Sequence, residues 1–136
     1  MNAAAIRAAI AAGLHPVVTA AAVYPYPFST LGTESPLVML ERTGTMYQKL
    51  TARGYQLKHA ITIHVFVSYD AADYTEEQSE NALDLAESQI VAWINDNPTG
   101  ALWRSLMLTG ASSADLITVQ GGARRHVAIP IEVLEV

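Results

Sequence analysis

The most restrictive feature of this sequence is an alternating segment from His59 to Tyr69. Every second residue in it is a branched aliphatic residue: Ile61, Ile63, Val65 and Val67. The positions between them are mixed: Thr62, His64, Phe66 and Ser68. Successive side chains of a strand point to opposite faces, so the pattern predicts a strand with one fully apolar face. Such a strand is typical of a sheet that helices cover on one side.

A long helix is predicted from Thr75 to Asn95. It opens on Thr75-Glu76-Glu77-Gln78, which has the form of a capping box, with Thr75 and Gln78 each bonding the other's backbone N–H. Glu76 and Glu77 lie where the helix dipole favours negative charge. Apolar residues then recur at helical spacing: Leu83, Ala86, Ile90, Trp93 and Ile94.

The remaining segments predict shorter elements. A first helix covers Ala3 to Ala12, with Asn2 as its N-cap and Gly13 as a left-handed stop. Strands are expected at Val17–Tyr24 and Leu37–Glu41, a short helix at Thr99–Leu108, and a final β-hairpin at Asp115–Val119 and Arg124–Val133. Because proline cannot donate a ladder hydrogen bond, Pro130 predicts that the last strand lies at an edge.

The segment from Arg42 to Lys58 allows two interpretations. It holds half of the eight basic residues, namely Arg42, Lys49, Arg53 and Lys58. A stretch of this kind between two strands is either a long hairpin or an excursion from the sheet.

The order of these elements indicates the fold class. Strands and helices do not alternate, which favours an α+β fold over a doubly wound sheet. We expect a mostly antiparallel sheet, with the long helix and the short N-terminal helix packed on one face and a hairpin at the C-terminal end. A length of 136 residues fits one domain, residues 1–136, with the excursion at 42–58 inside it.

The sequence offers little for catalysis or metal binding. There is no cysteine, which excludes disulfides, thiolate zinc sites and thiol nucleophiles. His59 and His64 are five residues apart on one strand and so lie on opposite faces; we expect solvent-facing histidines, no metal and no cofactor. No glycine–any–serine–any–glycine elbow occurs, and Ser112 has no evident base nearby. The chain is therefore not expected to be an enzyme.

Charge is separated along the chain. An acidic set occupies the region around the long helix: Asp70, Asp73, Glu76, Glu77, Glu80, Asp84 and Glu87. A basic set lies elsewhere: Arg42, Lys49, Arg53, Lys58, Arg124 and Arg125. Both sets are either solvated surfaces or contacts between subunits, in which the basic loop of one copy faces the acidic helix of the next. Only 15% of residues are charged, which leaves surface for a partner to cover, and the net charge of −5 argues against a dedicated nucleic-acid binder.

The layout resembles the tail terminator (tail completion) proteins of long-tailed bacteriophages. The resemblance is carried by the alanine-rich first helix, Val23-Tyr24-Pro25-Tyr26-Pro27 and Pro36-Leu37-Val38-Met39-Leu40-Glu41. The β segment Ala60–Asp70, the long helix and the terminal hairpin follow in the same order. No short motif transfers residue by residue.

The resemblance implies a virion structural protein that is assembled in the host cytoplasm. In that family, a six-membered ring of this subunit caps the head-proximal end of the tail tube and ends tube polymerisation. Its partners would be other copies of itself, the tail tube protein and a neck or head-completion protein. DNA would pass through the lumen without specific binding, and no membrane would be involved.

Other functions remain open at this point. A head–tail neck or stopper protein, or a minor tail protein, has the same size and the same need to oligomerise. From another class, a small α+β ligand-binding domain or hydrolase would need a pocket where His64, Asp70 and Ser112 converge. A host-derived interaction domain is a third alternative.

Overall fold

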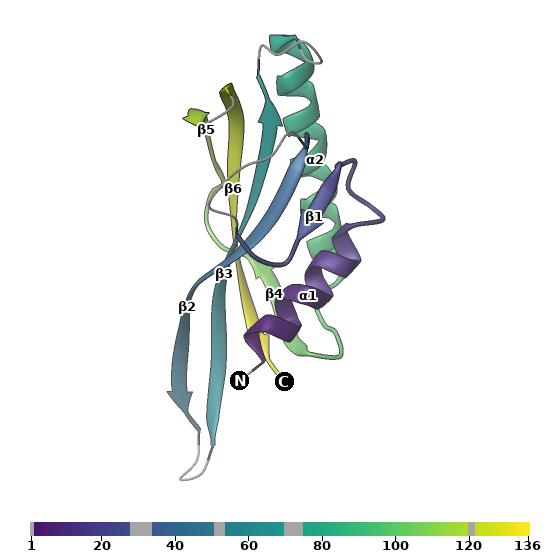
Figure 1. Cartoon of the computed structure of the whole chain (residues 1–136). Helices are drawn as coiled ribbons and strands as arrows, with labels where there is room; N and C mark the ends of the chain where they lie inside the picture. Colours follow the sequence, from purple (N-terminus) through teal and green to yellow (C-terminus); the bar gives the residue numbers. More distant parts are fainter. Residues whose placement is uncertain (1, 28–33, 51–53, 70–74, 120–121) are drawn as a thin grey trace.

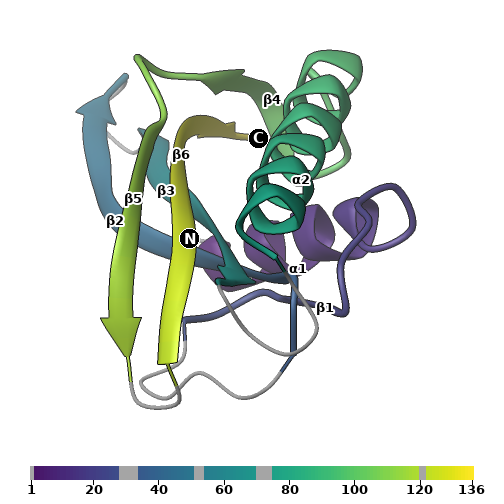
Figure 2. The same cartoon turned by 90° about the horizontal axis from the view of Figure 1, so that it is seen from above.

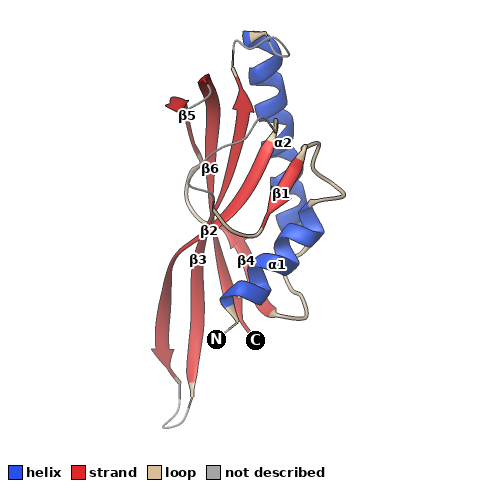
Figure 3. Cartoon of the chain, viewed as in Figure 1, coloured by secondary structure: helices blue, strands red, loops and turns tan. Residues whose placement is uncertain are grey.

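The computed structural model describes residues 2–27, 34–50, 54–69, 75–119 and 122–136. These residues form two helices and six strands (Figure 1). The elements are α1 (Ala3–Leu14), β1 (Ala22–Tyr24), β2 (Leu37–Lys49), β3 (Tyr55–Ser68), α2 (Glu76–Asp96), β4 (Trp103–Leu108), β5 (Ser113–Val119) and β6 (Gly122–Glu135). Both helices lie on the same side of the sheet (Figure 3), and the predicted α+β class is confirmed.

The sheet has the strand order β1-β2-β3-β6-β4, and β5 also pairs with β6. Every pairing is antiparallel except that of β1 with β2. β4 and β5 share one edge of β6: β4 pairs with residues Ile131 to Glu135 and β5 with residues Gly122 to Ala128. Seen from above, the sheet is strongly curled (Figure 2). This curl wraps one face of the sheet around the helices.

The main core lies between that face and the two helices. The alternate residues of β3 that the sequence singled out, Ile61, Ile63, Val65 and Val67, are at most 1% exposed. Helical residues complete the core: Ile6, Ile10 and Leu14 from α1, with Leu83, Ala86, Ile90 and Ile94 from α2. The predicted apolar face of the strand and the stripe of the long helix are both confirmed. A smaller cluster, Leu37, Met39 and Phe66, lies on the other face of the sheet.

The capping box at the start of α2 is confirmed. The Gln78 N–H donates to Thr75 Oγ1 at 3.2 Å, and the Thr75 N–H donates to Gln78 Oε1 at 2.9 Å. Two of the otherwise unpaired N–H groups at the helix start are thereby satisfied. None of the helices in the described ranges is long and apolar enough to cross a membrane.

The N-terminal helix differs from the prediction at both ends. It continues to Leu14, and the Asn2 side chain makes no capping hydrogen bond. Gly13 is therefore inside the helix instead of stopping it. A Cβ on Gly13 would lie 2.3 Å from Cζ2 of Trp93, so this glycine allows α1 to pack closely against α2.

Two further predictions about elements are wrong. The first strand covers only Ala22–Tyr24, and the segment predicted as a short helix contains β4 instead. Trp103 and Leu106 are both buried although they are three residues apart. The register of β4 shifts between Trp103 and Ser105, and this irregularity brings both side chains to the core face. The resulting three-residue spacing resembles that of a helix.

Pro130 lies in an inner strand, contrary to the prediction of an edge. β6 pairs with β3 on one side and with β4 and β5 on the other. The Pro130 carbonyl accepts from the Thr109 N–H, so this side of Pro130 faces the connection between β4 and β5. The proline ring nitrogen thus falls where the ladder is already interrupted, and the missing donor breaks no strand pairing.

Candidate functional site

The segment from Arg42 to Lys58 is a long hairpin. β1 pairs only with Leu37 to Met39 of β2, and β6 pairs with β3 from Lys58 onward. Residues 46–50 and 54–57, which we call the arm, extend past the rest of the sheet (Figure 1). Among the described residues, the two strands of the arm pair only with each other. The hairpin interpretation of the sequence is thus confirmed.

The arm exposes large apolar and aromatic side chains. Met46, Tyr47, Leu50 and Tyr55 are each 57–62% exposed. The cationic residue Lys49 is exposed among them. An isolated two-stranded ribbon is marginally stable in water, and its open edges are ready to pair with another chain. The arm therefore has the composition and the geometry of a contact surface for another protein.

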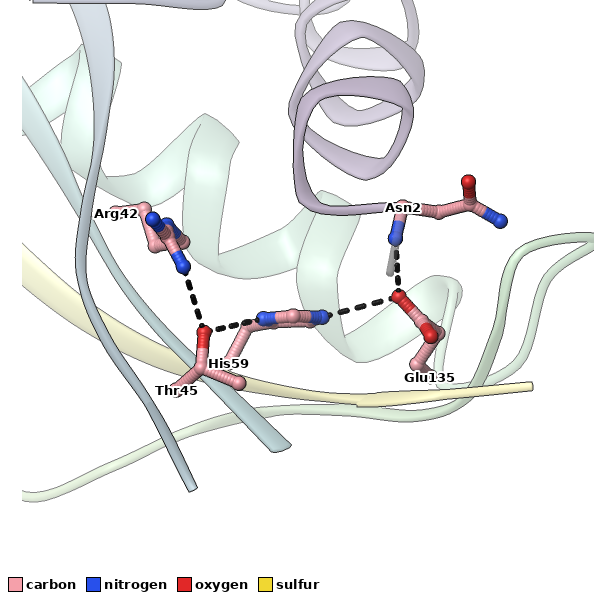
Figure 4. A network of polar contacts seen from close by, with 5 residues as sticks. All are labelled: Asn2, Arg42, Thr45, His59 and Glu135. Atoms are coloured by element: carbon pink, nitrogen blue, oxygen red, sulfur yellow. Dashed lines mark hydrogen bonds and ion pairs between the residues drawn. The ribbon is translucent and has the colours of Figure 1, made fainter. Parts of the chain in front are cut away.

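A polar network anchors the base of the arm (Figure 4). His59 is completely buried, and its two ring nitrogens contact Thr45 Oγ1 at 2.8 Å and Glu135 Oε1 at 3.1 Å. Arg42 Nη1 donates to Thr45 Oγ1 at 2.9 Å, and the Asn2 N–H donates to Glu135 Oε1 at 2.6 Å. The network thus joins both strands of the hairpin to the end of β6 and the start of α1.

A neutral His59 is one arrangement of protons that satisfies every hydrogen bond of the network. The Thr45 hydroxyl accepts from Arg42 and donates to His59 Nδ1, which leaves the Nε2–H of His59 to donate to Glu135. Burial alone would raise the pKa of Glu135. The hydrogen bonds from Asn2 and His59, together with the N-terminal charge, outweigh burial and hold the pKa of Glu135 below its ordinary value. Glu135 is therefore an ionised acceptor that fixes the buried imidazole.

The expectation that the histidines face solvent is wrong for His59. This residue has the same parity along β3 as Ile61 and Ile63, so it continues the buried face. Its odd-numbered position in the alternating pattern already indicated burial, but histidine is polar and was therefore expected to face solvent. His15 is exposed, as expected, whereas His64 and His126 are mostly buried.

A β-bulge marks the point where the arm leaves the body. The register between β2 and β3 shifts between Arg42 and Gly44, which leaves Thr43 without a partner residue in β3. The Thr43 hydroxyl donates to the Ala60 carbonyl at 3.2 Å. Bulges bend and twist the strand that carries them, which explains the change of direction at the base of the arm.

The structure separates the predicted basic residues into two groups. Arg42, Lys49 and Lys58 lie on or beside the arm, where Lys58 pairs with Glu132 at 3.4 Å. Arg124 and Arg125 lie in β6: the guanidinium of Arg124 is buried and donates to the Glu34 carbonyl, and Arg125 Nε pairs with Glu80 at 2.5 Å. Arg53 lies outside the described residues.

The predicted acidic residues lie at the other end of the molecule. Glu76 and Glu77 are exposed at the start of α2, and Asp84 is exposed one turn beyond Glu80. Helix α2 contains no lysine or arginine. Asp70 and Asp73 lie outside the described residues. The arm projects from one end of the subunit and α2 begins at the opposite end (Figure 1). Arg124 and Arg125 also lie toward the start of α2, where Arg125 pairs with Glu80, and Glu76, Glu77 and Asp84 are the exposed charges there in the described part of the helix.

The described residues of the proposed hydrolase constellation do not converge. The Ser112 hydroxyl donates to Glu87 of α2 at 3.2 Å, on the helix side of the sheet. His64 contacts Glu41 and His126 on the opposite face, and Asp70 lies outside the described residues. In the described ranges, no three histidine, aspartate or glutamate side chains are placed to hold a metal ion.

Comparisons with known proteins find likenesses among solved structures. No family model matches the chain, and no curated protein matches it. Among solved structures, it is similar to a chain of the virion of a native gene transfer agent particle. The identity is 15%, the match covers 95% of this chain and 86% of that chain, and the TM-score is 0.47. A likeness of this size assigns neither a family nor a function to the chain.

Proposed function

We propose that this chain is a virion structural protein that forms a ring at the head-proximal end of a phage tail tube. The ring, a hexamer in this proposal, ends tube polymerisation and joins the tail to the head without catalysis. Two observations support different parts of this proposal. The arm supports assembly with copies of the same chain, and the sequence resemblance to tail terminator proteins supports the place in the tail.

The observation that carries the proposal is the arm, with its exposed apolar residues and with outer strand edges that no other described strand pairs with. A single subunit leaves Tyr47, Tyr55 and Leu50 in water, which is unfavourable unless another surface covers them. The covering surface in this proposal is the next copy of the chain. Contacts that join two different patches of one subunit are head-to-tail and close into a ring when the rotation permits.

Charge complementarity selects the receiving surface. Lys49 is exposed on the arm, and Glu76 and Glu77 are exposed at the start of α2 at the far end of the subunit. Opposite charges across an interface steer the encounter and fix its register. We therefore place the arm of one copy against the acidic end of α2 in the next. Asp70 and Asp73 belong to the same acidic set in sequence.

The remaining partners follow from the proposed position. One face of the ring meets the last ring of the tail tube protein, and the other meets a neck or head-completion protein. DNA passes through the lumen without specific binding, in keeping with the net charge of −5, because an acidic wall repels phosphates.

The assembly step is tested with variants of the arm. In the double variant Tyr47→Ser/Tyr55→Ser, rings should be lost while the subunit stays folded, because these two side chains are exposed and contribute little to the core. Met107→Ser is the matched control, since Met107 is 49% exposed but belongs to β4 and not to the arm. Size-exclusion chromatography with light scattering gives the mass. Rings that survive the double change would contradict the role of the arm.

The pairing of arm and helix is tested by exchanging charges. Lys49→Glu should weaken the ring, and Glu77→Lys added to the same chain should restore it, because the pair again has opposite signs. Both residues are exposed, so neither change should unfold the subunit. If the double exchange is as weak as Lys49→Glu alone, the arm meets another surface.

The place in the tail is tested with the tube protein from the same genome. Adding the purified chain to polymerising tube protein should give short tubes that carry one ring at one end in electron micrographs. Tubes that lengthen normally and carry no ring, beside rings that bind the head connector, would instead identify a neck or stopper protein.

A further inference from the structure

A row of four polar side chains crosses the sheet on the face away from the helices. Glu41 of β2, His64 of β3, His126 of β6 and Asp115 of β5 follow one another across four strands. Glu41 Oε1 lies 3.1 Å from His64 Nε2, and Asp115 Oδ1 lies 2.8 Å from His126 Nδ1. Between the rings, His64 Nδ1 lies 2.8 Å from His126 Nε2. All three contacts have the length of hydrogen bonds.

The number of protons in this row follows from its geometry. Ionised carboxylates only accept hydrogen bonds, so His64 Nε2 and His126 Nδ1 each carry a proton. If both rings were neutral, the two inner nitrogens would be bare lone pairs facing each other at 2.8 Å. One further proton turns this repulsion into a hydrogen bond. Three hydrogen bonds in series thus require three protons on four nitrogens, which gives the two rings one positive charge.

The surroundings favour a single positive charge. The side chains of His64 and His126 are 19% and 14% exposed, and a carboxylate stands at each end of the row. Phe66 stacks on His126 with ring centroids 4.6 Å apart and planes 19° apart. An aromatic face at this distance attracts a cation.

The other charged or titratable groups near the row belong to neighbouring segments. Arg124 lies two residues before His126 on β6 and donates to the Glu34 carbonyl. Tyr24 of β1 donates to the Glu34 carboxylate, and Glu132 of β6 pairs with Lys58 further along the same face. Among these described groups, Arg124 carries a positive charge that opposes the charge on the rings, whereas the two carboxylates contact the rings directly.

We propose that His64 and His126 form a one-proton site, in which a single shared proton is held between His64 Nδ1 and His126 Nε2, with the carboxylates of Glu41 and Asp115 at the outer ends of the row. A second proton would place two imidazolium rings in contact, and removal of the shared proton would leave two opposed lone pairs. The site also fastens β5, which among the described strands pairs with β6 alone, because Asp115 is held by His126. This inference is independent of ring assembly.

Nuclear magnetic resonance of the whole chain with ¹⁵N-labelled histidine tests the proton count. The measurement is made at a pH at which the spectrum shows that the exposed His15 is neutral, with one of its two ring nitrogens unprotonated. At that pH, only one of the four ring nitrogens of His64 and His126 should be unprotonated. Two bare nitrogens, one on each ring, would overturn the proposal.

Removal of the two carboxylate charges supplies the second test. In Glu41→Gln/Asp115→Asn, the pair should lose the shared proton at the same pH, and the amides of β5 should exchange about fivefold faster. Glu132→Gln is the control, because it removes a carboxylate from the same face that contacts neither ring. A double variant that keeps the shared proton, or in which β5 exchanges as in the wild type, would contradict the proposal.

Discussion

Glu135 is the residue whose removal should most clearly weaken the base of the arm. In Glu135→Ala, the buried Nε2–H of His59 loses its acceptor, which costs about 1–3 kcal/mol. The Asn2 N–H loses its hydrogen bond as well, at about 1 kcal/mol. The free energy of unfolding should therefore fall by roughly 2–4 kcal/mol, which is about 1–2 M in the urea midpoint.

The conservative variant separates the charge of Glu135 from its shape. Glu135→Gln keeps an oxygen that can accept both hydrogen bonds but removes the charge, so it should cost roughly 1 kcal/mol at neutral pH. Glu132→Gln, on the same strand, removes a carboxylate that makes a partly exposed ion pair and should cost less than about 1 kcal/mol. Unfolding in urea is followed by the fluorescence of Trp93 and Trp103, whose ring centroids lie 6.5 Å apart.

The pH dependence of the Glu135→Gln effect follows from the direction of the pKa shift. The pKa of Glu135 is below its ordinary value of 4.5 in the folded chain. The charged carboxylate therefore contributes stability fully above pH 4.5, and this contribution is lost as the pH falls through the lowered folded pKa. The gap between wild type and Glu135→Gln should close in acid. Equal stability at pH 7, or a gap that persists unchanged in acid, would refute the reasoning.

Further predictions concern the helices. Gly13→Ala should lower the free energy of unfolding by about 1 kcal/mol, because overpacking against Trp93 outweighs the better helix propensity of alanine. In a Trp93→Phe background the same change should be neutral or stabilising. An equal loss in both backgrounds would argue against the contact. Thr75→Ala should lower the free energy of unfolding, measured with a chemical denaturant, by about 1 kcal/mol, because it removes the acceptor for the Gln78 N–H. Thr75→Ser keeps a hydroxyl and should retain most of the wild-type stability. An alanine variant as stable as the wild type would show that the cap is unimportant.

The sequence was most informative where a single periodicity or a local motif decides the structure. The alternation of Ile61, Ile63 and Val65 predicts β3, and Thr75 with Gln78 predicts the start of α2, because both signals depend on neighbours in the chain. β4 was missed because a register shift near Trp103 gives its buried residues a spacing of three. Such a shift is set by the partner strand and leaves no local signal.

The site was predicted only in part, for the same physical reason. The basic character of the segment from Arg42 to Lys58 was evident and a hairpin was one of its two interpretations, but neither its length as a paired ribbon nor its anchor could be read from composition. His59 meets Glu135 across 76 residues, and His64 meets His126 across 62. Contacts of this separation arise from strand order, and the order β3-β6-β5 was not predictable from local patterns.

The mass of the wild-type chain in solution tests the central claim most directly. Native mass spectrometry of the purified chain, alone and with tail tube protein, should give a closed multiple of the subunit mass, and six subunits in the proposed ring. A single-subunit mass at every concentration, also in the presence of tubes, would contradict the claim that this chain acts by assembling with copies of itself.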